Sequence, residues 1–137
     1  MSVKRKIFLS FRPEFFRPIL YNIKKYEYRK RFCDIPTTAY LYLSSPVKKV
    51  IGIMELGKPL HIDEIIANYN NDSDVYIRLS KCLNGGEKFA IPIESLQLFK
   101  VPISIDKIKE IKCDFSVPQC YLNLENYKSV LDYLECQ

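Results

Sequence analysis

The sequence predicts one α+β domain over residues 1–137, built on a closed or strongly curved β-barrel-like sheet with inserted short helices and a C-terminal helix. Three observations support this class. The chain has 137 residues and is 47% hydrophobic, enough for one sizeable core. No internal repeat or Gly/Ser linker divides it. Strand patterns outnumber helical ones and do not alternate with helices as a doubly wound parallel sheet requires.

The first elements are expected to be a strand, a short helix and a second strand. Residues 6–10 (KIFLS) indicate the first strand. Pro13 is well placed at a first helical position, and Pro18 keeps that helix short or kinked. Its apolar stripe consists of Phe15, Phe16, Ile19 and Leu20. In the next strand, residues 24–32 (KKYEYRKRF), tyrosines alternate with charged residues.

The middle of the chain is predicted to be mainly β-structure. Residues 38–45 and 48–60 are β-rich runs separated by a turn at Ser45-Pro46. Residues 62–69 have the spacing of an amphipathic helix. Residues 75–83 and 88–99 flank the sequence NGGE, which predicts a β-hairpin because Asn-Gly favours tight turns.

Two helices are expected near the C-terminus. The first covers residues 104–111 (SIDKIKEI). The second covers residues 124–136, where apolar residues recur at helical spacing behind Asn123, a good N-cap.

The charge is unevenly distributed along the chain. The formal net charge is +5, but residues 1–60 hold 13 Lys/Arg against 4 Asp/Glu, whereas residues 61–137 hold 8 against 12. The halves therefore carry +9 and −4, which suggests a face that meets polyanions unless the two halves interleave in space.

Composition also bounds the compartment and the cofactors. The five cysteines form no CxxC motif or metal-ligand spacing, which favours buried or idle thiols in a reducing cytoplasm. The single histidine, His61, has no paired His or nearby Cys. No apolar run is long enough to cross a bilayer. We expect a cytoplasmic monomer with no cofactor, no metal and no membrane contact.

The segment NIKKYEYR, residues 22–29, contains the main candidate site. Glu27 and Arg29 lie two apart on a strand and therefore project from one face. Lys24 joins them only if it sits in the preceding turn, which Asn22 favours. Two cations and one acceptor suit a nucleotide, with its anionic phosphate and its base-edge donors. A surface Glu27–Arg29 ion pair without further role is the alternative.

In this region the sequence resembles the ASCH family of the PUA-like superfold. That family has a motif of the form G-x-K-x-x-E-x-R, and here Lys24, Glu27 and Arg29 match it, with Asn22 in the glycine position. Residues 40–59 and 88–109 resemble later family strands, and VPQCYLNL resembles a C-terminal PPQSFxxL run with Cys120 where Ser is common. The likeness covers about residues 6–124 and implies RNA or a modified nucleoside as the partner.

Two function classes follow from the resemblance. One is an RNA- or modified-nucleotide-binding module with a basic cleft lined by Lys24, Glu27 and Arg29. The alternative is a small hydrolase that cuts RNA or deacylates modified cytidine, with Lys24 as general base and Glu27 beside it. Its nucleophile is left open among Ser10, Ser44, Ser45 and Cys120, because Glu27 occupies the position where the amidohydrolase members carry a hydroxyl.

Basic and aromatic residues also interleave, a pairing that often holds single-stranded nucleic acid. Core packing is the other interpretation for Tyr26 and Tyr28, and a solvated turn for Lys48 and Lys49. The interleaved set is Arg12, Arg17, Lys24, Lys25, Arg29, Lys30, Arg31, Lys48 and Lys49 among Tyr21, Tyr26, Tyr28, Tyr40 and Tyr42. The candidate binding residues are Lys24, Glu27, Arg29, Arg12, Lys25, Arg31, Ser44, Ser45 and Cys120.

Overall fold

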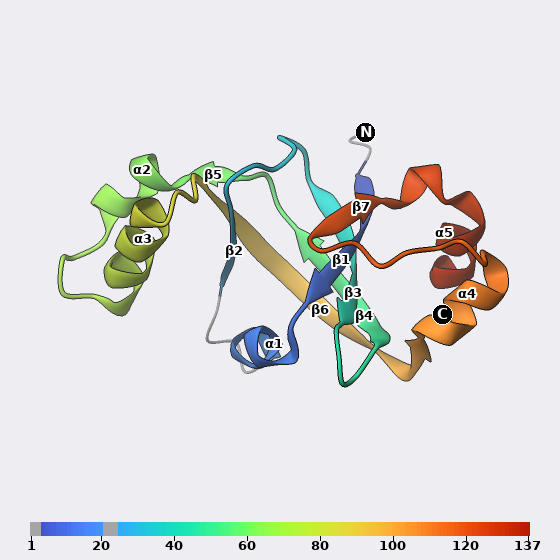
Figure 1. Ribbon diagram of the computed structural model, residues 1–137. Coiled ribbons are helices and arrows are strands. Elements are labelled where there is room, and N and C mark those ends of the chain that lie inside the picture. The colour runs from blue at the N-terminus through green and yellow to red at the C-terminus, as the bar shows by residue number, and fades with distance from the viewer. Residues whose placement is uncertain (1–3, 21–24) are drawn as a thin grey trace.

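A computed structural model describes residues 4–20 and 25–137. One mixed sheet curls into a half-barrel, with α2 and α3 at one end and α4 and α5 at the other (Figure 1). The strands are β1 (Arg5–Phe11), β2 (Tyr26–Arg29), β3 (Thr37–Leu43), β4 (Lys49–Leu56), β5 (Leu60–His61), β6 (Phe89–Ser104) and β7 (Tyr121–Asn123). The helices are α1 (Pro13–Leu20), α2 (Ile62–Ile65), α3 (Asp74–Asn84), α4 (Ile105–Ile111) and α5 (Lys128–Glu135), with 3-10 turns η1 (Ile66–Asn68) and η2 (Leu124–Asn126). The predicted α+β class with a strongly curved sheet is confirmed.

The sheet has the order β2-β6-β4-β3-β1-β7, and β5 also pairs with β6. β1 runs parallel to β3, whereas the other pairs are antiparallel. β6 is 16 residues long. Its first residues pair with β2 and β5, and the remainder pairs with β4, so this one strand connects the two parts of the sheet.

The curvature of the sheet encloses a hydrophobic cluster, here called the inner cluster. It unites residues of β1 with Ile91 of β6, although β3 and β4 separate these strands in the sheet. Only a curled sheet brings such residues into contact. The inner cluster consists of Ile7, Leu9, Phe11, Phe16, Ile19, Ala39, Leu41, Leu43, Met54, Leu56 and Ile91.

The opposite face of β1 contributes Phe8 to a second cluster, here called the outer cluster. This alternation of Ile7, Phe8 and Leu9 follows from the two-residue period of a strand. α4 and α5 cover the outer cluster with Ile108, Leu134 and their neighbours.

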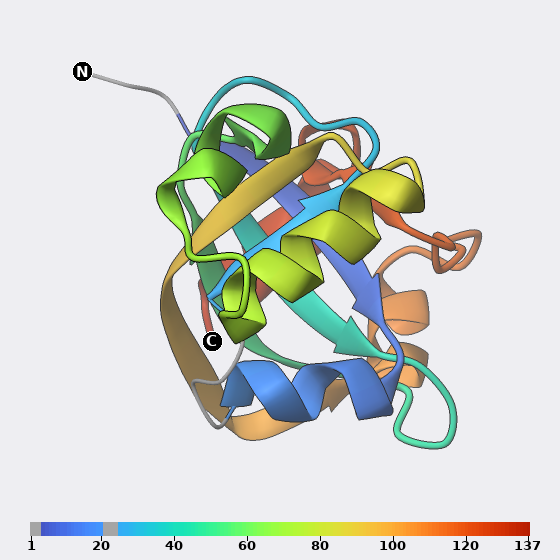
Figure 2. The same ribbon diagram turned by 90° about the vertical axis from the view of Figure 1, so that its left-hand side faces the viewer.

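A third cluster packs α2 and α3 onto β6. Ile62 and Leu79 are fully buried there with Ala90. Tyr26 and Tyr28 of β2 pack against them, so these tyrosines point away from the inner cluster. Figure 2 shows α3 lying across this outer side of β2 and β6.

The hairpin predicted around NGGE is wrong, because residues 75–83 lie in helix α3 rather than in a strand. Ser73 caps the helix by accepting a hydrogen bond from the Tyr76 amide at 3.1 Å. The Asn-Gly pair ends the helix instead of forming a hairpin turn, and Gly86 adopts a φ of +91° just after it. A positive φ serves the end of a helix as well as it serves a tight turn.

The remaining helices occur where they were predicted, with differences at their ends. Pro13 is the first residue of α1, but Phe15 is 54% exposed, so the predicted apolar stripe is narrower than expected. The helix predicted over residues 62–69 shortens to α2 followed by η1. Asn123 caps η2 and not α5, which begins at Lys128.

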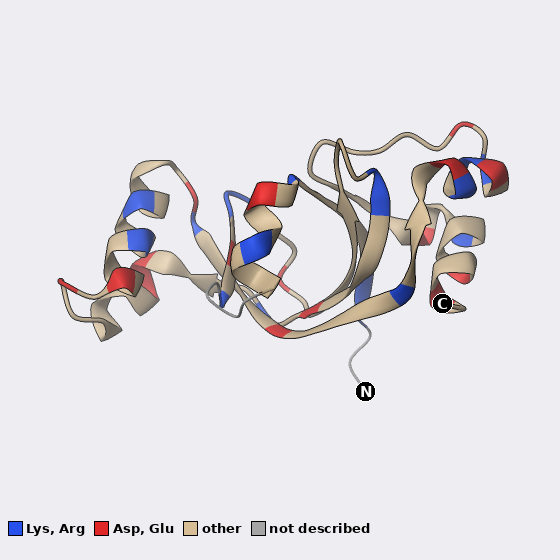
Figure 3. Ribbon diagram, turned by 90° about the horizontal axis from the view of Figure 1, so that it is seen from below, with Lys and Arg blue, Asp and Glu red and all other residues tan. Residues whose placement is uncertain are grey.

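The two halves of the chain interleave in space. β2 and β4 from the basic half pair with β6 from the acidic half, and β1 pairs with β7. Figure 3 accordingly shows residues of both signs on the helices at each end of the molecule. The basic and acidic halves of the sequence therefore do not form separate parts of the fold. Among the described helices, none is both long and apolar enough to span a membrane.

Candidate functional site

Glu27 and Arg29 project from β2 onto the inner face of the sheet. Glu27 lies opposite Ile91, a member of the inner cluster, and directly opposed residues share a face. The side chains of Glu27 and Arg29 are only 7% and 17% exposed, and Arg29 Nε lies 3.5 Å from Glu27 Oε1. The same-face arrangement predicted from their spacing is thus confirmed, and the pair is largely buried.

Burial makes the Arg29 guanidinium an unusual group. Among the described residues, its Nε is a buried donor without a hydrogen-bond partner, because the contact to Glu27 does not have hydrogen-bond geometry. A buried donor left without a partner is costly. Arg29 Nε therefore has hydrogen-bonding capacity that no described residue uses.

Lys24 and Asn22 lie outside the described residues. The convergence of Lys24 with Glu27 and Arg29, and its role as a general base, therefore stay predictions.

Arg5, Phe32 and Tyr121 form an aromatic contact that the sequence did not reveal. The guanidinium of Arg5 lies 4.6 Å from the ring centroid of Phe32 and 5.2 Å from that of Tyr121. The two rings meet edge to face at 5.6 Å. Phe32 follows β2 and Tyr121 begins β7, so the contact joins the two edges of the half-barrel.

Arg5 itself resembles Arg29 in its environment. Its Nε donates to Thr37 Oγ1 at 3.4 Å, whereas its Nη2 is buried with no hydrogen-bond partner in the described part of the chain. Arg5 alternates in phase with Ile7 and therefore faces the same side as the inner cluster. A cavity of about 270 Å³ lies beside it, lined by Lys4, Arg5, Ile35, Asn123 and Glu125.

The other predicted binding residues are more scattered. Arg12, Lys25 and Arg31 are exposed. Ser44 and Ser45 lie in the loop between β3 and β4, and the Ser44 amide donates to the Phe11 carbonyl at 2.8 Å. Ser44 and Ser45 therefore lie on a different connection of the sheet from the strand that carries Glu27.

Two of the proposed nucleophiles have clearer positions. Cys120 is exposed and directly precedes Tyr121 of the aromatic contact. Ser10 alternates in phase with Phe8, which places it on the face of β1 opposite to the inner cluster.

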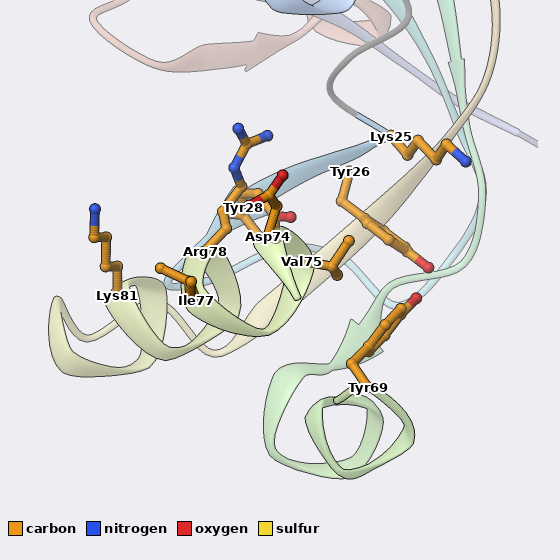
Figure 4. A pocket seen from close by; sticks show the side chains of 9 residues that line it. All are labelled: Lys25, Tyr26, Tyr28, Tyr69, Asp74, Val75, Ile77, Arg78 and Lys81. Carbon is orange, nitrogen blue, oxygen red and sulfur yellow. The ribbon is translucent and has the colours of Figure 1, made fainter. Parts of the chain in front are cut away.

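A second cavity, of about 620 Å³, lies on the outer side of β2 (Figure 4). Neither this cavity nor the smaller one is lined by Glu27 or Arg29. We call the cavity of about 620 Å³ the tyrosine pocket. Its lining residues are Lys25, Tyr26, Tyr28, Tyr69, Asp74, Val75, Ile77, Arg78 and Lys81.

The tyrosines divide into two environments. Burial raises the pKa of Tyr28 to about 12, and the nearby Arg78 charge opposes part of that rise. A hydrogen bond with Tyr69 raises the pKa of Tyr26. Tyr40 and Tyr42, by contrast, are buried in the outer cluster and cannot stack on nucleic acid.

The histidine and the cysteines, for which no metal role was predicted, differ in their exposure. His61 is exposed, and its ring lies near that of Phe89, with centroids 5.0 Å apart and planes inclined by 47°. None of the five cysteines forms a disulfide; Cys113, Cys120 and Cys136 are exposed, whereas Cys33 and Cys82 are partly buried. Within residues 4–20 and 25–137, no group of three or more His, Cys, Asp or Glu side chains could hold a metal ion.

Comparison with known proteins identifies relatives only among solved structures, because no family model and no curated protein matches the sequence. A crystal structure of a substitution variant of ASCH from Zymomonas mobilis is 25% identical, with 99% of this chain and 98% of that chain covered and a TM-score of 0.71. A second variant of that protein is 24% identical, with 97% of this chain and 98% of that chain covered and a TM-score of 0.71. The structure of ASCH from the same organism is 25% identical, with 93% of this chain and 94% of that chain covered and a TM-score of 0.66. The predicted resemblance to ASCH proteins is therefore confirmed over nearly the whole chain.

Proposed function

We propose that this chain, which has the fold of the ASCH proteins, binds RNA or a modified nucleotide on the inner face of its half-barrel. The ligand would contact Glu27 and Arg29, together with Lys24 as the sequence motif suggests. The proposal rests on the buried Glu27–Arg29 pair, whose Arg29 Nε has no hydrogen-bond partner among the described residues.

The chemistry of this pair suits a nucleotide. The planar guanidinium of Arg29 presents several donors, which match the oxygens of a phosphate or of a base. The carboxylate of Glu27 accepts hydrogen bonds from amino or hydroxyl groups. Burial limits competition from water, so each contact with a ligand is worth more than it would be at an exposed surface.

The aromatic contact near one end of this face supports the same proposal. Phe32 and Tyr121 are only partly buried against the inner cluster, and Arg5 is packed against both rings. Aromatic rings and Arg planes are the groups on which unpaired RNA bases stack. RNA in this location would therefore be single-stranded.

The test is fluorescence anisotropy with a labelled single-stranded RNA of about ten nucleotides, a length that spans one small binding domain. Arg29→Ala is expected to weaken binding by about 5- to 150-fold, which corresponds to the ~1–3 kcal/mol of one good bidentate contact to a base edge. Arg29→Lys keeps the charge but loses the planar fork, so it is expected to weaken binding as well. Lys109→Ala, at an exposed position on α4, serves as the control and is expected to bind like the parent.

Thermal unfolding of each variant shows whether the fold survives. Arg29→Ala is the variant at risk of unfolding, because removal of one partner from a buried pair is destabilising. If it unfolds, Arg29→Lys is the variant that tests the proposal. Parental affinity in a folded Arg29→Lys and a folded Arg29→Ala variant would refute RNA binding at this face.

A further inference from the structure

We propose that the tyrosine pocket is a second binding site for single-stranded RNA, on the opposite side of β2 from Glu27 and Arg29. This inference does not depend on the inner-face site, because it rests on a different cavity and on different residues. Tyr26 and Tyr28 line the tyrosine pocket, whereas Glu27 between them faces the inner cluster.

The tyrosine pocket is of a size and composition suited to a nucleotide. Its volume of about 620 Å³ lies within the range of small-molecule sites. Three tyrosines from β2 and from the segment after η1 surround it, while α3 supplies the remaining wall. It therefore combines flat aromatic surface with a boundary of charged side chains.

The rings are arranged so that a base has surfaces to stack on. The centroids of Tyr26 and Tyr28 are 6.3 Å apart and their planes are inclined by 40°, so they do not stack on each other. Tyr69 approaches Tyr26 from the other side of the cavity, and their hydroxyl ends lie close together (Figure 4). All three residues are only partly buried, although each also packs against the third cluster.

The charges favour an anion. Among the described residues that line the tyrosine pocket, Lys25, Arg78 and Lys81 stand against one acid, Asp74, a formal charge of +2 (three minus one). No ion pair is recorded for these three cations within the described part of the chain. Arg78 and Lys81 project from α3 in the same direction, as Figure 4 shows, whereas Lys25 points away from that helix.

These features favour single-stranded RNA over an acidic peptide or a duplex. An acidic peptide would use the cations, but it has no need of three tyrosine rings. A duplex keeps its bases stacked on each other, so only a single strand offers free base faces to the rings. In this arrangement the bases contact Tyr26 and Tyr69, and the phosphates contact Arg78 and Lys81.

The charge test is a salt titration of RNA binding, again with a labelled single strand of about ten nucleotides. The double variant Arg78→Gln/Lys81→Gln is expected to bind about 10-fold more weakly. The slope of log affinity against log salt is expected to fall by about 1.4, twice the value of about 0.7 for one contact with a single strand. Lys107→Gln/Lys109→Gln on α4 removes the same charge at exposed positions and is expected to leave affinity and slope near parental values.

The stacking test uses Tyr69. Tyr69→Leu is expected to weaken binding by about 5- to 150-fold with an unchanged salt slope, because a stacked base contributes about 1–3 kcal/mol without releasing counterions. Tyr69→Phe retains the ring but loses the hydroxyl contact with Tyr26, and it is expected to bind more tightly than Tyr69→Leu. A merely structural role for Tyr69 would lower the melting temperature without this separation of affinity from salt slope.

The outcomes distinguish the two sites. Weaker binding in the α3 double variant with parental binding in Arg29→Lys supports the tyrosine pocket and refutes the inner face. Amide chemical-shift changes on adding RNA are expected in residues 74–84 if the tyrosine pocket binds it. Parental affinity and salt slope in a folded Arg78→Gln/Lys81→Gln variant would overturn the inference and leave the cavity to a ligand other than RNA.

Discussion

Two arginines on the inner side of the sheet carry guanidinium nitrogens that are buried without hydrogen-bond partners in the described residues, namely Arg5 Nη2 and Arg29 Nε. Arg5 is partly compensated by its hydrogen bond to Thr37 and by the aromatic contact, and Arg29 is partly compensated by Glu27. Such donors lower stability unless a partner is supplied. A ligand that accepts from either nitrogen therefore binds with less competition from existing contacts.

The sequence predicted Arg29 as a site residue but did not predict a role for Arg5. Glu27 and Arg29 were predictable because a strand repeats every two residues, so positions two apart share a face. The role of Arg5 was not, because Phe32 and Tyr121 are distant in sequence and only the closed fold brings them to it.

The pH dependence of stability offers a test at Tyr40, which is only 3% exposed. Burial, and then the charges of Glu135 and Glu55, raise the pKa of Tyr40 to about 12. The unfolded value is about 10, so the folded state holds the proton more tightly. The resulting stabilisation is complete below pH 10 and is lost as the pH rises through 12.

We expect Tyr40→Phe to remove this part of the pH dependence. Urea unfolding at pH of about 9 and about 11.5 is expected to show a loss in unfolding free energy that is smaller by about 2 kcal/mol in the variant than in the parent. An equal loss in both proteins would mean that Tyr40 does not titrate abnormally in the folded state.

Helix α3 shows where local patterns mislead at the scale of an element. Residues 75–80 alternate apolar and more polar side chains and contain Val75 and Ile77, which favour a strand. The helix forms because Ser73 caps it and Leu79 is fully buried against α2 and β6. The cap signal at Ser73 was present in the sequence, but the Asn-Gly pair at the other end indicated a hairpin more strongly.

The pairing of β4 with β6 depends on a close backbone approach at Gly52. A Cβ atom at this position would meet the carbonyl oxygen of Gln97 and lie 2.9 Å from Leu98 Cα, so backbone would have to move. Gly52→Ala is therefore expected to lower the unfolding free energy by about 2 kcal/mol or more, the effect of overpacking a tight site.

Gly57→Ala is the matched control in the same part of the chain. Its Cβ would meet only the Glu94 side chain, with the nearest atom 3.3 Å away, and that side chain is able to move. Chemical denaturation of both variants is the measurement. A small effect of Gly52→Ala, similar to that of Gly57→Ala, would show that the two strands separate easily at this point.

On the scale of the whole molecule, the resemblance to ASCH proteins predicted the curved sheet better than any single pattern did. The large sequence separation between paired strands explains this, since β1 and β7 pair across more than a hundred residues. Local periodicity contains no information about such pairings. The tyrosine pocket was likewise beyond prediction, because it needs α3 to lie against β2, and α3 was expected to be a strand.

The half-barrel has two edges, and the Phe32–Tyr121 contact joins them beside β2 and β7. A double-mutant cycle with Phe32→Ala and Tyr121→Ala measures its contribution. We expect a coupling energy of about 0.5–1.5 kcal/mol, the usual value for an aromatic pair. We also expect faster amide hydrogen exchange in β2 for each variant, because the edge that carries Glu27 and Arg29 loses its tie to β7.

The edge-to-face pair of Phe115 and Tyr127, with centroids 5.6 Å apart, provides the control because it packs on the outer cluster at the other end of the molecule. Its cycle is expected to show similar coupling in stability but no selective change of exchange in β2. If the effects of Phe32→Ala and Tyr121→Ala simply add, or if β2 exchanges at the parental rate in both, the contact does not hold the edges together. The position of Arg29 would then have to be fixed by its pairing with β6 alone.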